Sequence, residues 1–198
     1  SGTLGPIAAR VLMKMLYGAR YARCDLLRAI CGLARRVTKW TVMQDEQLHR
    51  LVCYLKSTLH MREVGWVGDN AADLRLCLFS DAALASDPSD HVSTSGVYFQ
   101  IQGPDTRMPL SGQSKKQSAV SHSTPEAEMV AMDHAIRTVG LPGLELWETI
   151  LQRKLRIEFY EDNAAAIQIC KTGRNPTMRH LGRTHRISCS WLAERVRE

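Results

Sequence analysis

The first third of the chain repeats apolar residues at the spacing of amphipathic helices. This pattern predicts three helices, at residues 7–19, 26–37 and 45–59. Glycine and small polar residues then gather between Gly65 and Asn70, which is typical of a linker. We therefore expect residues 1–68 to form a small α-helical subdomain.

A different pattern begins at Leu74. Short apolar runs bounded by turn residues predict strands at residues 74–79, 96–101, 108–111 and 155–160. Helical patterns predict helices at residues 124–139, 164–170 and 185–196. Gly140 is expected to end the first of these helices, and residues 87–90 are expected to form a loop. The order β-β-β-α-β-α indicates a mixed α/β domain at residues 69–198.

Three acidic residues lie at the ends of these elements. Asp81 follows the first predicted strand, Glu128 lies near the start of the helix at 124–139, and Asp162 follows the last predicted strand. Such positions meet at one edge of an α/β sheet, so we expect the carboxyl groups to lie within about 8 Å of one another, the scale of a two-metal site. Clustered carboxylates repel one another unless a cation compensates them, and hard divalent cations prefer oxygen ligands. Taken singly, Asp81 could start a turn and Asp162 could cap a helix.

The choice between the two glutamates of this helix follows from helical spacing. Glu128 shares a stripe with the small apolar residues Ala131, Ala135 and Val139, which let a helix lie close to a sheet. Glu126 lies on a more mixed face and suits the first turn, where the helix dipole favours a carboxylate. We expect Glu128 to point toward the sheet edge.

Charge is distributed unevenly along the chain. Residues 1–68 carry 11 Lys/Arg and 4 Asp/Glu (net +7), residues 69–170 carry 8 and 14 (net −6), and residues 171–198 carry 7 and 2 (net +5). An acidic middle between basic ends suits a metal site held between surfaces that bind a polyanion, although solvated helix faces have similar compositions.

Several classes of protein do not fit the sequence. No apolar run approaches the roughly 20 residues that a membrane-spanning helix needs, so we expect no membrane association. The 6 cysteines form no Cys-x-x-Cys pair, which favours reduced thiols over a zinc site or a disulfide framework. The sequence does not start with Met, and we expect it to be a segment of a longer chain.

Short motifs follow one another in a fixed order along nearly the whole chain. They are Tyr21-Ala22-Arg23-Cys24-Asp25-Leu26, Tyr54-Leu55-Lys56-Ser57-Thr58, Phe79-Ser80-Asp81-Ala82, Ser93-Thr94-Ser95-Gly96, Ser114-Lys115-Lys116-Gln117, Glu126-Ala127-Glu128, Glu161-Asp162-Asn163 and Arg183-Thr184-His185. Any one motif is weak, but the ordered set is specific. It resembles the C-terminal part of the reverse transcriptase and the ribonuclease H domain of a Copia-type (Pseudoviridae) retrotransposon Pol polyprotein.

The resemblance implies a fold and a chemistry. The fold would be a ribonuclease H-like mixed sheet with flanking helices, its last strand missing, preceded by a thumb- or connection-like segment at residues 1–68. The activity would be hydrolysis of the RNA strand of RNA/DNA hybrids by two Mg²⁺ (or Mn²⁺) ions. Asp81 would be the shared metal ligand, with Glu128 and Asp162 on one ion each.

The resemblance also implies partners. These would be the RNA/DNA hybrid and the remainder of the reverse transcriptase, in an intracellular setting such as the cytoplasm, a virus-like particle or the nucleus. The candidates for phosphate contacts are Lys115, Lys116, Arg174, Arg179, His180, Arg183 and His185.

The chain departs from the family pattern at some positions. Gly112 stands where the family has Trp, and Ser188 stands where it has Asp. The family's fourth carboxylate follows the last strand, and this sequence ends before it, so we expect nuclease activity in the parent protein and poor cleavage, or none, by this segment alone. Two alternatives therefore stay open: a catalytically incomplete hybrid-binding or scaffold module, and another nuclease or integrase of the same fold. Integrases, however, place their glutamate last.

Overall fold

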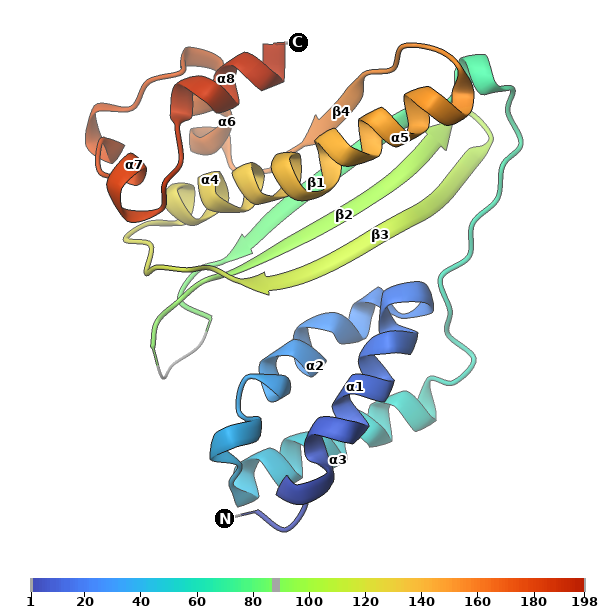
Figure 1. Cartoon of the computed structure of the whole chain (residues 1–198), viewed down its shortest axis with the longest axis vertical. Coiled ribbons are helices and arrows are strands. Elements are labelled where there is room, and N and C mark those ends of the chain that lie inside the picture. The colour runs from blue at the N-terminus through green and yellow to red at the C-terminus, as the bar shows by residue number, and fades with distance from the viewer. Residues whose placement is uncertain (1, 87–89, 198) are drawn as a thin grey trace. The chain divides into compact units, whose positions relative to one another are not determined.

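The computed structural model describes residues 2–86 and 90–197. Within this range the chain forms two compact units, which are described separately (Figure 1). The first unit runs to Val64 and includes Gly112–Ser114, and the second comprises Gly65–Ser111 and Lys115 onward. Most of the loop predicted at residues 87–90 lies outside the described residues.

The first unit consists of helices. They are α1 (Gly5–Ala22), α2 (Leu27–Ala34) and α3 (Val42–Ser57), with 3₁₀ turns at Cys24–Leu26 and Val37–Lys39. Their apolar stripes form one core, in which Leu12 and Ile30 are fully buried. The Asp45 carboxylate accepts hydrogen bonds from the Leu4 backbone N–H (3.0 Å) and the Trp40 Nε1–H (2.7 Å), which ties the start of α1 to α3.

The second unit contains the sheet. Its strands are β1 (Arg75–Ala83), β2 (Thr94–Gly103), β3 (Thr106–Lys116) and β4 (Ile157–Tyr160). Its helices are α4 (Thr124–Ala135), α5 (Leu141–Leu151), α6 (Ala164–Thr172), α7 (Leu181–Thr184) and α8 (Cys189–Arg197), with 3₁₀ turns at Ala71–Asp73 and Pro176–Met178.

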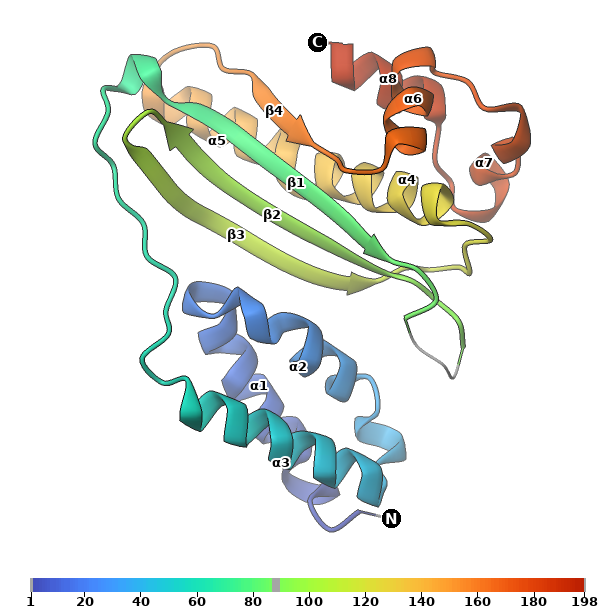
Figure 2. The same cartoon turned by 180° about the vertical axis from the view of Figure 1, so that it is seen from behind.

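The four described strands have the order β3-β2-β1-β4. β1 runs antiparallel to β2 and parallel to β4. Helices α4 and α5 follow one another along one face of this sheet (Figures 1 and 2). The predicted fold class, a mixed α/β sheet flanked by helices that is consistent with a ribonuclease H-like fold, is confirmed.

Alternating residues of the strands separate the two faces of the sheet. Leu78 of β1 pairs with Phe99 of β2, and both are buried in the core with Met129 of α4. On the opposite face Phe79 stacks on Tyr160, with ring centroids 4.6 Å apart. The core face is therefore the one covered by α4.

The prediction that the helix beginning at Thr124 would end at Gly140 is wrong. The chain passes through a π-helical turn (Ile136–Gly140) directly into α5, and Pro142 occupies the first turn of α5. A Cβ on Gly140 would lie 2.9 Å from Leu78 Cδ2, so the missing side chain serves close packing on β1. Gly140 is therefore explained by close packing against the sheet and does not end the helix.

In the described part of the chain no helix has both the length and the apolar character needed to cross a membrane.

Candidate metal centre

Two strand ends bring Asp81 and Asp162 to the same region. Asp81 lies within β1, opposite Gly96, because β1 continues to Ala83 and extends beyond the predicted strand. Asp162 lies two residues beyond the end of β4, the parallel neighbour of β1. The side chain of Asn163 accepts a hydrogen bond from the Ala166 backbone N–H (3.0 Å) and caps α6. The turn between β4 and α6 is thereby fixed next to Asp81.

Helix α4 supplies the third carboxylate. Ser123 Oγ accepts a hydrogen bond from the Glu126 N–H (3.3 Å) and caps the helix. Ala127 and Ala131 are fully buried and cluster with Ala82 of β1. Small side chains at this contact let the backbones approach closely. The contact places the first turns of α4, including Glu128, beside the C-terminal half of β1.

The three predicted carboxylates converge in the structure. One carboxylate oxygen from each of Asp81, Glu128 and Asp162 lies within 4.8 Å of the others. Glu128 is 3% exposed, whereas Asp81 and Asp162 are exposed. The cluster is therefore open to solvent on the side of the two aspartates and closed on the side of the glutamate.

The environment of Glu128 is unfavourable for a carboxylate without a cation. Burial, together with the charges of Glu161, Asp81 and Asp162, raises the pKa of Glu128 to about 8, although the Ala82 backbone donates a hydrogen bond to it. Its Oε2 atom is buried and has no hydrogen-bond partner in the part of the chain that the structure describes. A buried oxygen without a partner, beside two further carboxylates, fits a hard divalent cation such as Mg²⁺.

A further carboxylate, Glu161, lies near this cluster and was missed by the sequence analysis. It accepts hydrogen bonds from Ser80 Oγ (2.9 Å) and the Asn163 N–H (3.1 Å). Burial raises its pKa, and the charges of Asp162 and Asp81 add to the rise. Its position directly before Asp162 was the available signal, but strand alternation alone does not show which way a side chain beyond the strand end points.

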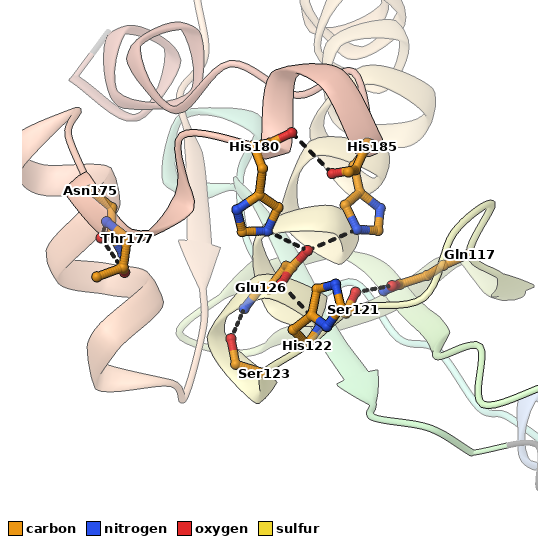
Figure 3. Close-up of polar contacts among 10 residues, drawn as sticks. Gln117, Ser121, His122, Ser123, Glu126, Asn175, Thr177, His180 and His185 are labelled. Atoms are coloured by element: carbon orange, nitrogen blue, oxygen red, sulfur yellow. Dashed lines mark hydrogen bonds and ion pairs between the residues drawn. The ribbon is translucent and has the colours of Figure 1, made fainter.

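Glu126 has a different environment from Glu128. It is 1% exposed, and its Oε1 atom lies 3.1 Å from His180 Nε2 and 3.0 Å from His185 Nε2 (Figure 3). Its Oε2 atom accepts a hydrogen bond from the His122 backbone N–H (3.0 Å). Burial alone would raise the pKa of Glu126, but the His122 amide and the two imidazoles hold it below its usual range. Glu126 therefore joins the start of α4 to the segment around α7.

The candidate phosphate contacts differ in their surroundings. The structure places His185 inside the protein, with its side chain fully buried against Glu126, and His180 partly buried beside it. Lys116 forms an ion pair with Asp90. The exposed candidates are Lys115, Arg174, Arg179 and Arg183.

The whole sequence was compared with protein-family models and with known proteins. No protein-family model matches this chain. The Retrovirus-related Pol polyprotein from transposon RE2 of Arabidopsis thaliana is 31% identical over 172 residues. The match covers 83% of this chain and 11% of that polyprotein, so the chain spans only a small part of its relative. The similarity supports the interpretation that this chain is part of a retrotransposon Pol polyprotein.

Proposed function

We propose that residues 69–198 are the ribonuclease H domain of a retrotransposon reverse transcriptase, which hydrolyses the RNA strand of RNA/DNA hybrids with two Mg²⁺ or Mn²⁺ ions. Two observations carry this proposal: Asp81, Glu128 and Asp162 bring carboxylate oxygens within 4.8 Å of one another, and Glu128 Oε2 is buried with no hydrogen-bond partner among the described residues. The similarity to a Pol polyprotein supports the same setting.

The three carboxylates would hold the metal ions, each through oxygen. Such ions would supply Lewis-acid chemistry: they would lower the pKa of a water molecule that attacks the phosphate and would stabilise the charge on the leaving 3′ oxygen. Asp81 and Asp162 are exposed and can meet a phosphate that arrives from solvent, whereas Glu128 approaches from the protein side. Because the pKa of Glu128 is about 8, this carboxyl group carries a proton at neutral pH, and it would release that proton on binding a cation.

The remaining basic residues suit contacts with the backbone of the hybrid. Lys115, Arg174, Arg179 and Arg183 are exposed on the second unit and would neutralise phosphates without reading sequence. Residues 1–68, with a net charge of +7, would act as a thumb- or connection-like segment that binds the same nucleic acid. The remainder of the reverse transcriptase would be the protein partner.

The test is cleavage of an RNA/DNA hybrid whose RNA strand carries a 5′ label. In the parent polyprotein we expect cleavage of the RNA strand with Mg²⁺ or Mn²⁺, none in EDTA and none of a DNA duplex. Asp81→Asn should abolish this cleavage, whereas Glu145→Gln, at an exposed position on α5, should not affect it. A second arm makes the same substitutions in the present chain. Cleavage that is equal in the Asp81→Asn variant would show that another site, or a contaminating nuclease, is responsible.

A further inference from the structure

A pocket of about 440 Å³ lies at the end of the sheet where β1 and β4 begin. These two strands are parallel neighbours and start in register, with Leu76 beside Ile157, so the segments that lead into them meet at one edge (Figure 2). The pocket is lined by Leu74, Arg75, Arg153, Lys154, Leu155, Arg156 and Glu158. We call it the basic pocket.

The basic pocket concentrates positive charge in an acidic part of the chain. Residues 69–170 have a net charge of −6 and contain 8 Lys/Arg. Half of these, Arg75, Arg153, Lys154 and Arg156, line this one pocket. Two carboxylates oppose them: Glu158 lies 3.4 Å from Arg75, and Glu148 lies 3.0 Å from Lys154. Four positive and two negative charges leave a local net charge of +2.

The geometry of the basic pocket is partly fixed before any ligand binds. The Arg153 guanidinium donates hydrogen bonds to the backbone oxygens of Ala71 (2.7 Å from Nη2) and Leu74, so its side chain is held in place. Leu155 is buried and Leu74 is partly buried, and they supply an apolar part of the lining. Arg153 thereby braces the wall of the pocket. The exposed cations Arg75, Lys154 and Arg156 beside it suit phosphate, because Arg matches phosphate oxygens with several N–H donors.

The position of the basic pocket relative to Asp81, Glu128 and Asp162, which we call the acidic triad, indicates the source of the phosphate. Arg75 and Asp81 are six positions apart on β1, which corresponds to about 20 Å at about 3.3 Å per strand residue. A nucleic acid duplex rises about 3.4 Å per base pair along its axis, so about six base pairs would cover this distance. Cations at the start of β1 and β4 and carboxylates at their other end would thus meet one extended polyanion at two points.

We propose that the basic pocket binds phosphate groups of a nucleic acid backbone about 20 Å from the acidic triad, and so anchors the substrate away from the site of cleavage. This inference rests on the proposed function, because the same nucleic acid must reach the triad. Binding measured in EDTA separates the two. If the hybrid binds through the pocket but is never cleaved, only the proposed function is contradicted. If the hybrid is cleaved but its binding does not depend on the pocket, only this inference is contradicted.

The experiment compares the full chain with Arg156→Glu and Lys171→Glu. Both residues are exposed and both substitutions change the charge by the same amount, but Lys171 lies on α6, outside the pocket. The dissociation constant for an RNA/DNA hybrid is measured by fluorescence anisotropy in EDTA at several salt concentrations. We expect Arg156→Glu to weaken binding about tenfold at low salt and to reduce the salt slope by about 0.9 for each phosphate that the variant no longer neutralises.

The control Lys171→Glu should retain the parent salt slope. Arg75→Gln gives a second, milder variant, which is used if Arg156→Glu fails to fold by circular dichroism, and its binding should weaken in the same direction. A further arm titrates inorganic phosphate at constant ionic strength, with binding followed by calorimetry. Hybrid affinities and salt slopes equal to those of the parent would overturn the proposal. So would a saturable phosphate site that Arg156→Glu removes while hybrid affinity is kept, because the pocket would then serve a small anion.

Discussion

The raised pKa of Glu128 makes a quantitative prediction about stability. The pKa of this carboxyl group increases from its ordinary value of 4.5 to about 8 through burial and the charges of Glu161, Asp81 and Asp162. The folded state therefore keeps a proton that the unfolded chain releases, and ∂ΔG/∂pH for unfolding is negative between the two values. The stabilisation is fully present below the unfolded pKa and is lost as the pH rises to the folded pKa.

The magnitude follows from the same shift. Each pH unit between the two pKa values changes the free energy of unfolding by about 1.36 kcal/mol, so the interval from about pH 5 to about pH 8 amounts to about 3.5 kcal/mol after partial titration at both ends is included. Glu128→Gln removes the titrating group while keeping the shape of the side chain. The variant should lack the pH-dependent loss of stability. Its free energy of unfolding should therefore rise relative to that of the parent by about 3.5 kcal/mol between about pH 5 and about pH 8.

The assay is urea unfolding in EDTA, read from hydrogen exchange of α4 amides so that the second unit is followed on its own. The measured quantity is the difference between parent and variant at each pH, because contributions of titrating groups that do not interact with Glu128 cancel in it. Glu145→Gln, at an exposed position on α5, is the control and should run parallel to the parent. A Glu128→Gln profile that also runs parallel to the parent would refute this electrostatic account of the triad.

Three further predictions concern neighbouring features. Binding of Mg²⁺ at about pH 7 should release about one proton, because Glu128 is still protonated there; calorimetry in two buffers of different ionisation enthalpy measures this, and release that persists in Glu128→Gln contradicts it. Glu126→Gln should destabilise the second unit by about 2–4 kcal/mol near neutral pH and speed hydrogen exchange around His180 and His185. Since the pKa of Glu126 is lowered, the difference in stability between the parent and Glu126→Gln should disappear as the pH falls through that pKa. A difference that does not depend on pH would argue against a charged Glu126 as its cause. Affinity for nucleic acid should fall with salt by about 0.9 log units per log unit for each phosphate neutralised. Replacing Arg10 and Lys14 of α1 by Gln should flatten this slope, and an unchanged slope would show that this face of the first unit does not contact phosphates.

Much of the fold could be predicted because apolar periodicity reports burial directly. The strand around Leu78 and the stripe of Ala131, Ala135 and Val139 are buried in the structure as expected. The continuation through Gly140 could not be predicted, because a glycine that ends a helix and a glycine that packs against a strand are the same letter. Only the neighbouring Leu78 side chain distinguishes them.

The acidic site shows a similar limit. Strand ends and a helix start were sufficient to predict that Asp81, Glu128 and Asp162 would meet. The long-range partners were not predictable, because His185 reaches Glu126 across 59 residues and Glu161 meets Ser80 across 81. The basic pocket was also missed, since its cations come from two segments that become neighbours only through the pairing of β1 with β4.

The acidic triad is proposed to hold divalent metal ions for phosphodiester hydrolysis, and metal binding there can be observed directly. The most direct measurement is a crystal structure of this chain grown with Mn²⁺ and recorded at the manganese absorption edge. We expect an anomalous peak bound by the carboxylates of Asp81, Glu128 and Asp162, at oxygen distances typical of a hard cation, and no such peak in Asp81→Asn crystals. Anomalous density absent from the triad at saturating Mn²⁺, or unchanged in the Asp81→Asn protein, would contradict the proposed metal centre.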